Sequence, residues 1–239
     1  MPGLRCLLML LAVFVADGRC LAEEEAPHPS DHETRHIEGW TVRIDQRLLA
    51  EPDVELGKRA IRLLGDRLYE IQLVVAPDRL AELRKVTIQL DRTHGALTSM
   101  QYHPSAEWLR THGYSAELAR CVHLPDAARF ASPKHHQQQP WAMLHELAHA
   151  YHDQVLGNEH AEIQAAWERF RDSGRYGSVL HIDGVPRPHY GLNNAKEFFA
   201  EMSEAYFGLN DFYPFHRAEL RRDEPELFEL LQDLWGPLP

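Results

Sequence analysis

Two histidines and a glutamate stand together in the middle of the chain, in the segment His145-Glu146-Leu147-Ala148-His149. The flanking residues are apolar and helix-forming, which predicts a buried helix. Residues four apart on a helix face the same side, so both imidazoles can bind one zinc ion. Glu146 can then reach a water molecule on the open side of the metal and take its proton. This HExxH pattern indicates a zinc hydrolase, although a chain with 16 histidines can also contain it by coincidence.

Zinc that is held by two histidines needs at least one more protein ligand and a position that stays open for water. The segment from Tyr190 to Glu201 is the best source of that ligand. Glu197 and Glu201 are one helical turn apart there and share a face. We expect Glu197 to bind the zinc ion and Glu201 to stand behind it, where it accepts a hydrogen bond from a ligand histidine. The alternative for both glutamates is an exposed position on a helix, which is common for this residue.

The pairing of these two motifs resembles the catalytic domain of the anthrax lethal factor type of zinc metallopeptidase. In that family, HExxH is followed by a tyrosine and then, seven residues after it, by Glu-Phe-Phe-Ala-Glu; Tyr190 and Glu197-Phe198-Phe199-Ala200-Glu201 match this arrangement. The resemblance covers about Trp141 to Gly208. It implies one zinc ion per chain and a Tyr190 side chain that points into the cleft. The roles that it implies for the other residues are zinc ligand for His145, His149 and Glu197, general base for Glu146, and ligand support for Glu201.

The function that we expect is therefore hydrolysis of peptide bonds in a peptide or protein substrate, as by an endopeptidase. Zinc and the Tyr190 hydroxyl would stabilise the oxyanion while Glu146 transfers the proton. Two alternatives stay open. The first is a secreted, non-catalytic zinc-binding protein of the same fold that binds a peptide or protein partner, but such a protein does not need Glu146. The second is a structural zinc site, in which the fourth position is usually filled by Cys or His.

Composition limits the class of protein further. With 239 residues, 44% of them hydrophobic, the chain is long enough for a leader and one domain. The net charge is −11 and no basic cluster is evident, which argues against nucleic acid and anionic membranes as partners. Of the three cysteines, Cys6 and Cys20 lie in the predicted leader, and Cys121 lies in an apolar run that predicts a core position.

Residues 1–22 have the features of a secretory signal peptide. Arg5 precedes an apolar run from Leu7 to Val15 that is too short to span a bilayer, and small residues precede a plausible cleavage point before Glu23. We expect a secreted or periplasmic protein without stable membrane insertion after the signal is removed. A membrane anchor is the alternative.

Residues 23–39 are acidic and rich in histidine, and we expect them to form a flexible tail before a single domain of residues 40–239. The four-residue spacing of His28, His32 and His36 makes a second metal site conceivable. Prolines beside His28 weaken a helix there, so we expect these three histidines to be solvated.

Periodicity predicts the elements that must position the site. Alternating apolar and polar residues predict strands, and apolar residues three and four apart predict amphipathic helices. His152 lies on roughly the same helix face as His145, and we expect it to be exposed or hydrogen-bonded. The expected strands are 40–45, 85–91, 96–102 and 121–124, with a hairpin around 179–185; the expected helices are 52–75, 77–84, 104–111, 141–156, 160–171, 194–207, 215–221 and 225–235.

These elements predict an α+β fold of the zincin-like metallopeptidase type. It would have a small mixed sheet, an active-site helix and a helical C-terminal half. In zinc peptidases an edge strand beside the cleft often pairs with the substrate backbone. Residues 121–124, just before the active-site helix, are a candidate for that strand, and an ordinary core strand is the alternative.

Overall fold

The computed structural model describes residues 27–237, and within them the fold is mixed α+β, as predicted. The expected signal peptide, residues 1–22, lies outside the described residues. Strands are β1 His32–Ile37, β2 Trp40–Asp45, β3 Thr87–Leu90, β4 Gln101–Tyr102, β5 Cys121–Leu124, β6 Val179–Leu180 and β7 Pro186–Arg187. Helices are α1 Val54–Val74, α2 Pro77–Leu83, α3 Ala106–Thr111, α4 Ala127–Phe130, α5 Pro133–Gln138, α6 Ala142–Tyr151, α7 Ala161–Asp172, α8 Ala195–Phe207, α9 Arg217–Asp223 and α10 Pro225–Trp235. Shorter helical turns are η1 Gln46–Leu49, η2 Ala116–Leu118, η3 His152–Leu156 and η4 Tyr190–Leu192.

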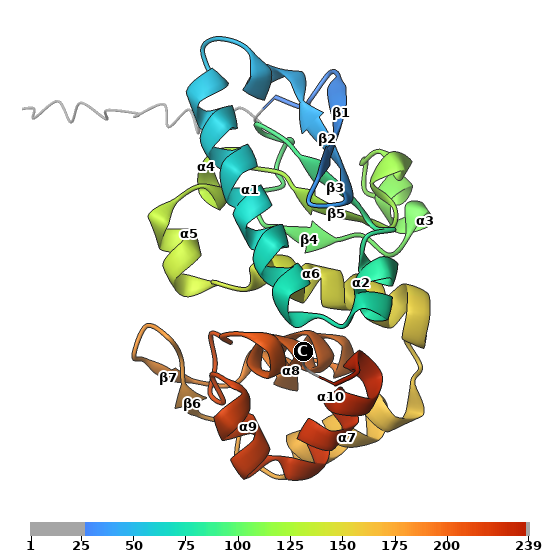
Figure 1. The fold of residues 1–239 in the computed structure, drawn as a ribbon, viewed down its shortest axis with the longest axis vertical. Coiled ribbons are helices and arrows are strands. Elements are labelled where there is room, and N and C mark those ends of the chain that lie inside the picture. Colours follow the sequence, from blue (N-terminus) through green and yellow to red (C-terminus); the bar gives the residue numbers. More distant parts are fainter. Residues whose placement is uncertain (1–26, 238–239) are drawn as a thin grey trace, which may run out of the picture.

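The molecule has two parts with α6 between them (Figure 1). The larger sheet and α1 lie in the upper part of the view, and α7 to α10 lie in the lower part. The predicted hairpin near residues 179–185 is present as β6 and β7. None of the helices between residues 27 and 237 is long and apolar enough to cross a membrane.

The five-stranded sheet has the order β1-β2-β3-β5-β4. β2, β3 and β5 run parallel, and the two edge strands, β1 and β4, are antiparallel to their neighbours. β5 lies between β3 and β4, and all four of its residues are buried. Cys121–Leu124 is therefore the core strand of the two alternatives, and its interpretation as the edge strand is wrong. The edge is formed by β4, which keeps only the last two residues of the expected strand 96–102.

The prediction of a flexible tail is wrong for His32–Ile37, which forms β1 and pairs with β2 along its whole length. The two strands are joined by Glu38 and Gly39, whose φ angles are +49° and +91°. Positive φ at both central residues of a two-residue loop is the geometry of a tight hairpin turn. β1 was missed because an edge strand with mostly exposed side chains has no apolar alternation.

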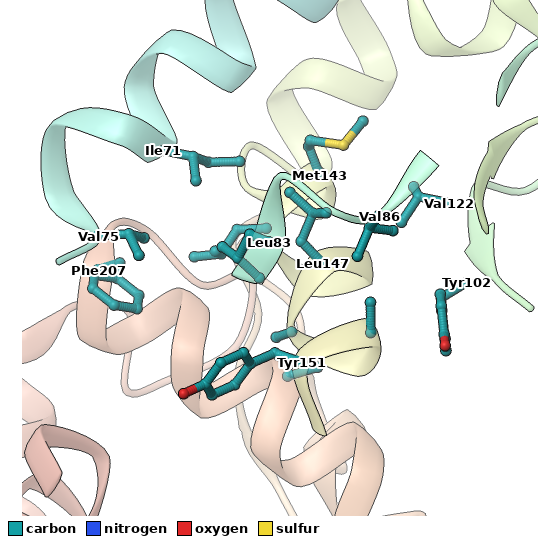
Figure 2. Packing of buried hydrophobic residues seen from close by; sticks show 14 of the residues in the cluster. Ile71, Val75, Leu83, Val86, Tyr102, Val122, Met143, Leu147, Tyr151 and Phe207 are labelled. Atoms are coloured by element: carbon teal, nitrogen blue, oxygen red, sulfur yellow. The ribbon is translucent and has the colours of Figure 1, made fainter. Parts of the chain in front are cut away.

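The core is built on one face of α1 and on α6. The buried positions of α1 recur every three or four residues, as the sequence predicts, and Gly65 does not interrupt the helix. Figure 2 shows Ile71 of α1 and Leu83 at the end of α2 facing Met143 and Leu147 of α6. Each fully buried side chain of this size contributes about 1.5–3 kcal/mol to stability, so α6 is held firmly under the sheet.

The C-terminal helix fastens α6 to α8. The Trp235 ring of α10 stacks on Tyr151 of α6, with ring centroids 4.4 Å apart, and on Phe199 of α8 at 5.6 Å. Its indole N–H donates to Ser203 Oγ at 2.9 Å, so the polar atom of this buried ring is satisfied. The two helices that carry the motif residues are thus packed against each other by a residue far from both motifs.

Candidate metal centre

The two histidines of α6 meet a glutamate of α8. His145 Nε2 lies 3.1 Å from Glu197 Oε2, and His149 Nε2 lies 3.3 Å from the same oxygen. The imidazole rings are 4.7 Å apart. Two imidazole nitrogens and one carboxylate oxygen, all within 4.8 Å of one another, form a group that could hold a metal ion. The residues that the sequence predicts as ligands therefore converge, and they fit a divalent ion.

The position of Glu197 is fixed by the residue that caps the N-terminus of α8. Asn194 stands at the N-cap, and its side-chain oxygen accepts from the backbone N–H groups of Lys196 and Glu197, both at 3.0 Å. The cap fixes where the first turn begins, and Glu197 lies in that turn. Phe198 and Phe199 are buried in the core, which leaves the acidic face of the helix toward α6.

A second glutamate of α8 lies beside the Nδ1 atom of His145, and it is Glu204 instead of the expected Glu201. Glu204 Oε1 lies 2.7 Å from His145 Nδ1, within hydrogen-bond distance. Glu201 Oε1 is 3.6 Å from the same nitrogen, which is too long for a hydrogen bond. Both carboxylates are only 3% exposed. Sequence reasoning missed Glu204, although its position seven residues after Glu197 is two helical turns along the same face.

Acidic groups are concentrated around His145. Burial raises the pKa of Glu201 well above its usual value, with Asp211 and Glu204 adding to the effect, and burial raises the pKa of Glu204 to about 7. Burial also raises the pKa of Asp211. Burial alone would raise the pKa of Glu197 too, but hydrogen bonds from His145 and His149 hold it well below its usual range. So many carboxyl groups around two imidazoles favour a cation in this place.

Glu146 lies between the metal centre and the edge of the sheet. Its Oε2 accepts a hydrogen bond of 2.7 Å from the backbone N–H of Tyr102 in β4. Burial raises the pKa of the Glu146 carboxyl, and the neighbouring His149 and His145 lower it. A carboxylate with a raised pKa that is fixed at one oxygen is suited to accept and return a proton.

Tyr190 is at the mouth of the site, as expected. It begins η4 and is 46% exposed, and its ring is 6.4 Å from the ring of His145. The turn is fixed by His189, whose Nδ1 accepts from the backbone N–H of Gly191 at 3.0 Å. Partial burial raises the pKa of the Tyr190 hydroxyl, and the Glu197 charge adds to this effect. The hydroxyl therefore keeps its proton and can donate it in a hydrogen bond.

These groups line one cavity of about 600 Å³. Its walls include the end of the sheet around β4, the HExxH face of α6 and the acidic face of α8, with further residues from α4, α5, η4 and the segment around Asp211. Ser99, Met100, Gln101 and Tyr102 form the wall at the sheet edge. The cavity is large enough for several residues of an extended peptide.

The predictions for His152 and Cys121 can also be compared with the structure. The prediction that His152 is exposed or hydrogen-bonded is wrong: the ring is buried 5.1 Å from the Phe199 ring, and neither nitrogen has a partner in the part of the chain that the structure describes. Burial lowers its pKa to about 4, so His152 is a neutral packing residue. Cys121 is a buried core residue, as predicted, and burial raises the pKa of its thiol to about 11.

Comparisons of the chain with protein-family models, with curated proteins and with solved structures found no match.

Proposed function

We propose that this protein is a zinc-dependent metallopeptidase of the anthrax lethal factor type. The observation that supports it best is the convergence of His145, His149 and Glu197, with Glu146 beside them in a cavity that ends at a sheet edge. A structural zinc site needs neither a free carboxylate nor a cavity of this size. Secretion through residues 1–22 is part of the same proposal.

Zinc, when bound by these three residues, would lower the pKa of a water molecule toward about 7 and polarise the substrate carbonyl. Glu146 accepts the proton of the attacking water and passes it to the leaving amine. Tyr190 donates its hydroxyl hydrogen to the developing oxyanion. Glu204 accepts the Nδ1 hydrogen of His145, which leaves Nε2 free to face the metal.

The edge strand β4 gives the cavity a place for a peptide. One side of β4 pairs with β5, and its other side faces the cavity, where the Tyr102 N–H is directed at Glu146. Backbone groups alternate in direction along an antiparallel strand, and Gln101 therefore faces β5 while Tyr102 faces away from it. An extended substrate can pair with this edge, which favours a peptide over a small molecule.

The test is mass-spectrometric profiling of a diverse peptide mixture that is incubated with the zinc-loaded protein and, in parallel, with Glu146→Gln. We expect new cleavages with the wild type and a loss of at least about 10²-fold in rate in the variant. Glu146→Gln should keep its zinc, because Glu146 is not a ligand. Equal cleavage by both proteins would sink the assignment of the base. No cleavage despite bound zinc would favour the non-catalytic binding protein.

A further inference from the structure

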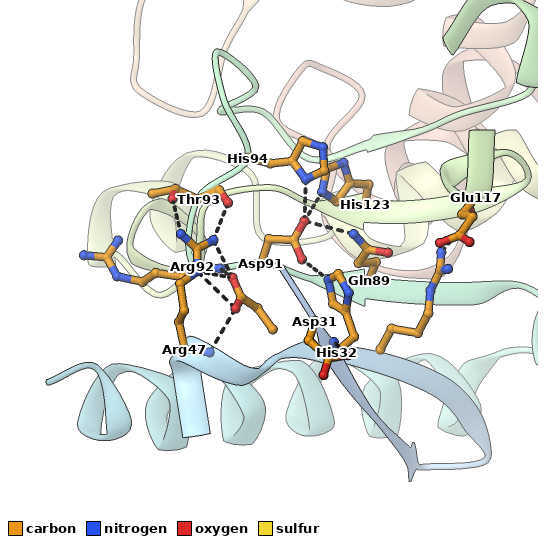
Figure 3. Close-up of polar contacts among 12 residues, drawn as sticks. Asp31, His32, Arg47, Gln89, Asp91, Arg92, Thr93, His94, Glu117 and His123 are labelled. Carbon is orange, nitrogen blue, oxygen red and sulfur yellow. Dashed lines mark hydrogen bonds and ion pairs between the residues drawn. The ribbon is translucent and has the colours of Figure 1, made fainter. Parts of the chain in front are cut away.

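A second cluster of histidines surrounds one buried carboxylate in the larger sheet (Figure 3). Asp91 follows β3 directly and is 0% exposed. Its Oδ2 lies 2.8 Å from His94 Nδ1 and 2.8 Å from His123 Nε2. Its Oδ1 lies 2.7 Å from His32 Nε2, and Gln89 donates to Oδ2 at 3.0 Å. The expectation of a solvated His32 is therefore wrong.

This cluster is separate from the candidate metal centre. None of its five residues lines the cavity that contains Glu146, and they come from β1, from β3 and the turn after it, and from β5. The chemistry proposed above leaves the cluster without a role.

We propose that Asp91, His94 and His123 form a second site for a divalent transition-metal ion, with zinc as the ion that we expect. The three ligand atoms lie within 4.8 Å of one another, and all three residues are buried. Two imidazole nitrogens and one carboxylate oxygen suit zinc and its neighbours in the first transition row, and they do not suit calcium or magnesium.

The surroundings have the supporting contacts that a metal site needs. A histidine that binds a metal through one nitrogen usually donates the hydrogen of the other. His123 Nδ1 lies 3.3 Å from His103 Nε2, within reach of such a hydrogen bond. The carboxylate is fixed in the same way, because its second oxygen faces His32.

Charge balance also favours a cation. A buried carboxylate is costly unless it is compensated, yet the groups in contact with Asp91 are three imidazoles and an amide. Arg47, on the neighbouring η1, is already engaged with Asp45, at 2.5 Å.

The role that fits this site is structural. Its ligands join the turn after β3 to β5, and through His32 they reach the edge strand β1. Because all three ligands are buried, the site gives a substrate no access. A metal there would hold the N-terminal edge of the sheet, whose side chains bury little apolar surface of their own.

The test is metal stoichiometry in the full chain, with the first site removed. His149→Gln, stripped by chelator and then dialysed against micromolar free zinc, should retain about one zinc per chain as measured by elemental analysis. Adding His123→Gln to this variant should remove that zinc, whereas adding His112→Gln, at an exposed histidine outside the cluster, should not. Retention of the same zinc in the His123→Gln protein, or its absence from His149→Gln, would overturn the proposal.

A measurement without substitutions covers the case in which His123→Gln does not fold, as seen by circular dichroism. The wild-type chain loaded with cadmium-113 should give two NMR resonances in the range of nitrogen- and oxygen-ligated cadmium. A single resonance would overturn the second site. Because His149→Gln and the cadmium spectrum need no peptide cleavage, this inference can fail or succeed independently of the proposed function.

Discussion

The residue on which the metal centre depends most, besides its ligands, is Glu204. Its carboxylate is the hydrogen-bond partner of His145 Nδ1, and removal of such a partner usually costs about 10–100-fold in metal affinity. We therefore expect Glu204→Gln to weaken zinc binding by about tenfold or more, because a neutral amide accepts more weakly than a carboxylate. Competition with a chromophoric chelator measures this affinity.

Glu201→Gln is the matched control, since Glu201 is equally buried on the same helix but is 3.6 Å from His145 Nδ1. It should change the affinity less than Glu204→Gln does. A larger loss in Glu201→Gln would restore the role that the sequence suggested for Glu201.

The sequence predicted that His145, His149 and Glu197 approach one another, but it did not predict that Glu204 lies behind His145. The spacing of HExxH on one helix brings His145 and His149 together, whereas Glu197 was expected because a metal held by two histidines needs a third ligand. The choice between Glu201 and Glu204 depends on how α8 is rotated and shifted against α6. Packing around Trp235 decides that rotation, and no local pattern reports it.

A buried histidine should make stability depend on pH. Burial lowers the pKa of His189 to about 3, and its Nε2 has no partner among residues 27–237. The usual value in an unfolded chain is about 6.5, so between these values the unfolded state binds more protons and stability falls as pH falls. At pH 5 the loss from this residue amounts to about 2 kcal/mol.

His189→Asn removes this titration but keeps a side-chain acceptor near the Gly191 N–H. Urea unfolding of both proteins in chelator, at pH 7.5 and at pH 5, should show a smaller loss in the variant. The smaller asparagine side chain leaves a cavity that lowers the stability of the variant at both pH values. This constant decrease does not affect the loss of stability between pH 7.5 and pH 5. An equal loss in both proteins would assign the pH dependence to other groups.

At the scale of elements, the close approach of α6 and α8 depends on a glycine. Gly208 caps the end of α8, and a Cβ there would lie 2.0 Å from the ring of Trp141, which stands at the N-cap of α6. We expect Gly208→Ala to cost about 1–3 kcal/mol, as overpacking of a core does. It should also weaken zinc binding, because the shifted helices carry the ligands. Urea unfolding and chelator competition measure the two effects.

Gly177→Ala provides the comparison, since its new methyl group would be 3.8 Å from the nearest heavy atom, an ordinary contact. Its stability should stay within about 0.5 kcal/mol of the wild type. If Gly208→Ala were as stable, the Trp141 ring would have to move aside without cost.

Long elements with clear periods were predicted with accurate bounds, whereas of the two edge strands β1 was missed and β4 is only the last two residues of the expected strand 96–102. α1 and α8 have several turns of consistent apolar spacing and clear starts, so their bounds agree within two residues of the expectation. β1 and β4 form by hydrogen bonding to the unpaired edge of a neighbouring strand. This edge is present only once the sheet has assembled, so no local sequence pattern reports it. For this reason the edge beside the cavity was assigned to β5 instead of β4.

At the scale of the whole molecule, the metal centre joins the two parts of the fold, because His145 and His149 come from α6 and Glu197 from α8. A ligand that binds only the folded state stabilises it by about 2.7 kcal/mol when its concentration is 100 times its dissociation constant. In a chain of 239 residues this corresponds to an increase of roughly 5–10 °C in Tm. Since the second site would add its own contribution, we expect chelator to lower the Tm of the wild type by at least that amount and excess zinc to restore it.

The variant Glu197→Gln separates this site from any other metal in the chain. It weakens the first site and leaves Asp91, His94 and His123 unchanged, so its Tm should fall less in chelator than that of the wild type. The decrease in Tm that chelator still causes in Glu197→Gln is then due to the second site. Adding His123→Gln to this variant should abolish that decrease. If chelator lowers the Tm of the wild type and of Glu197→Gln equally, a metal bound between α6 and α8 does not contribute to stability. The two helices would then be held together by packing around Trp235 alone.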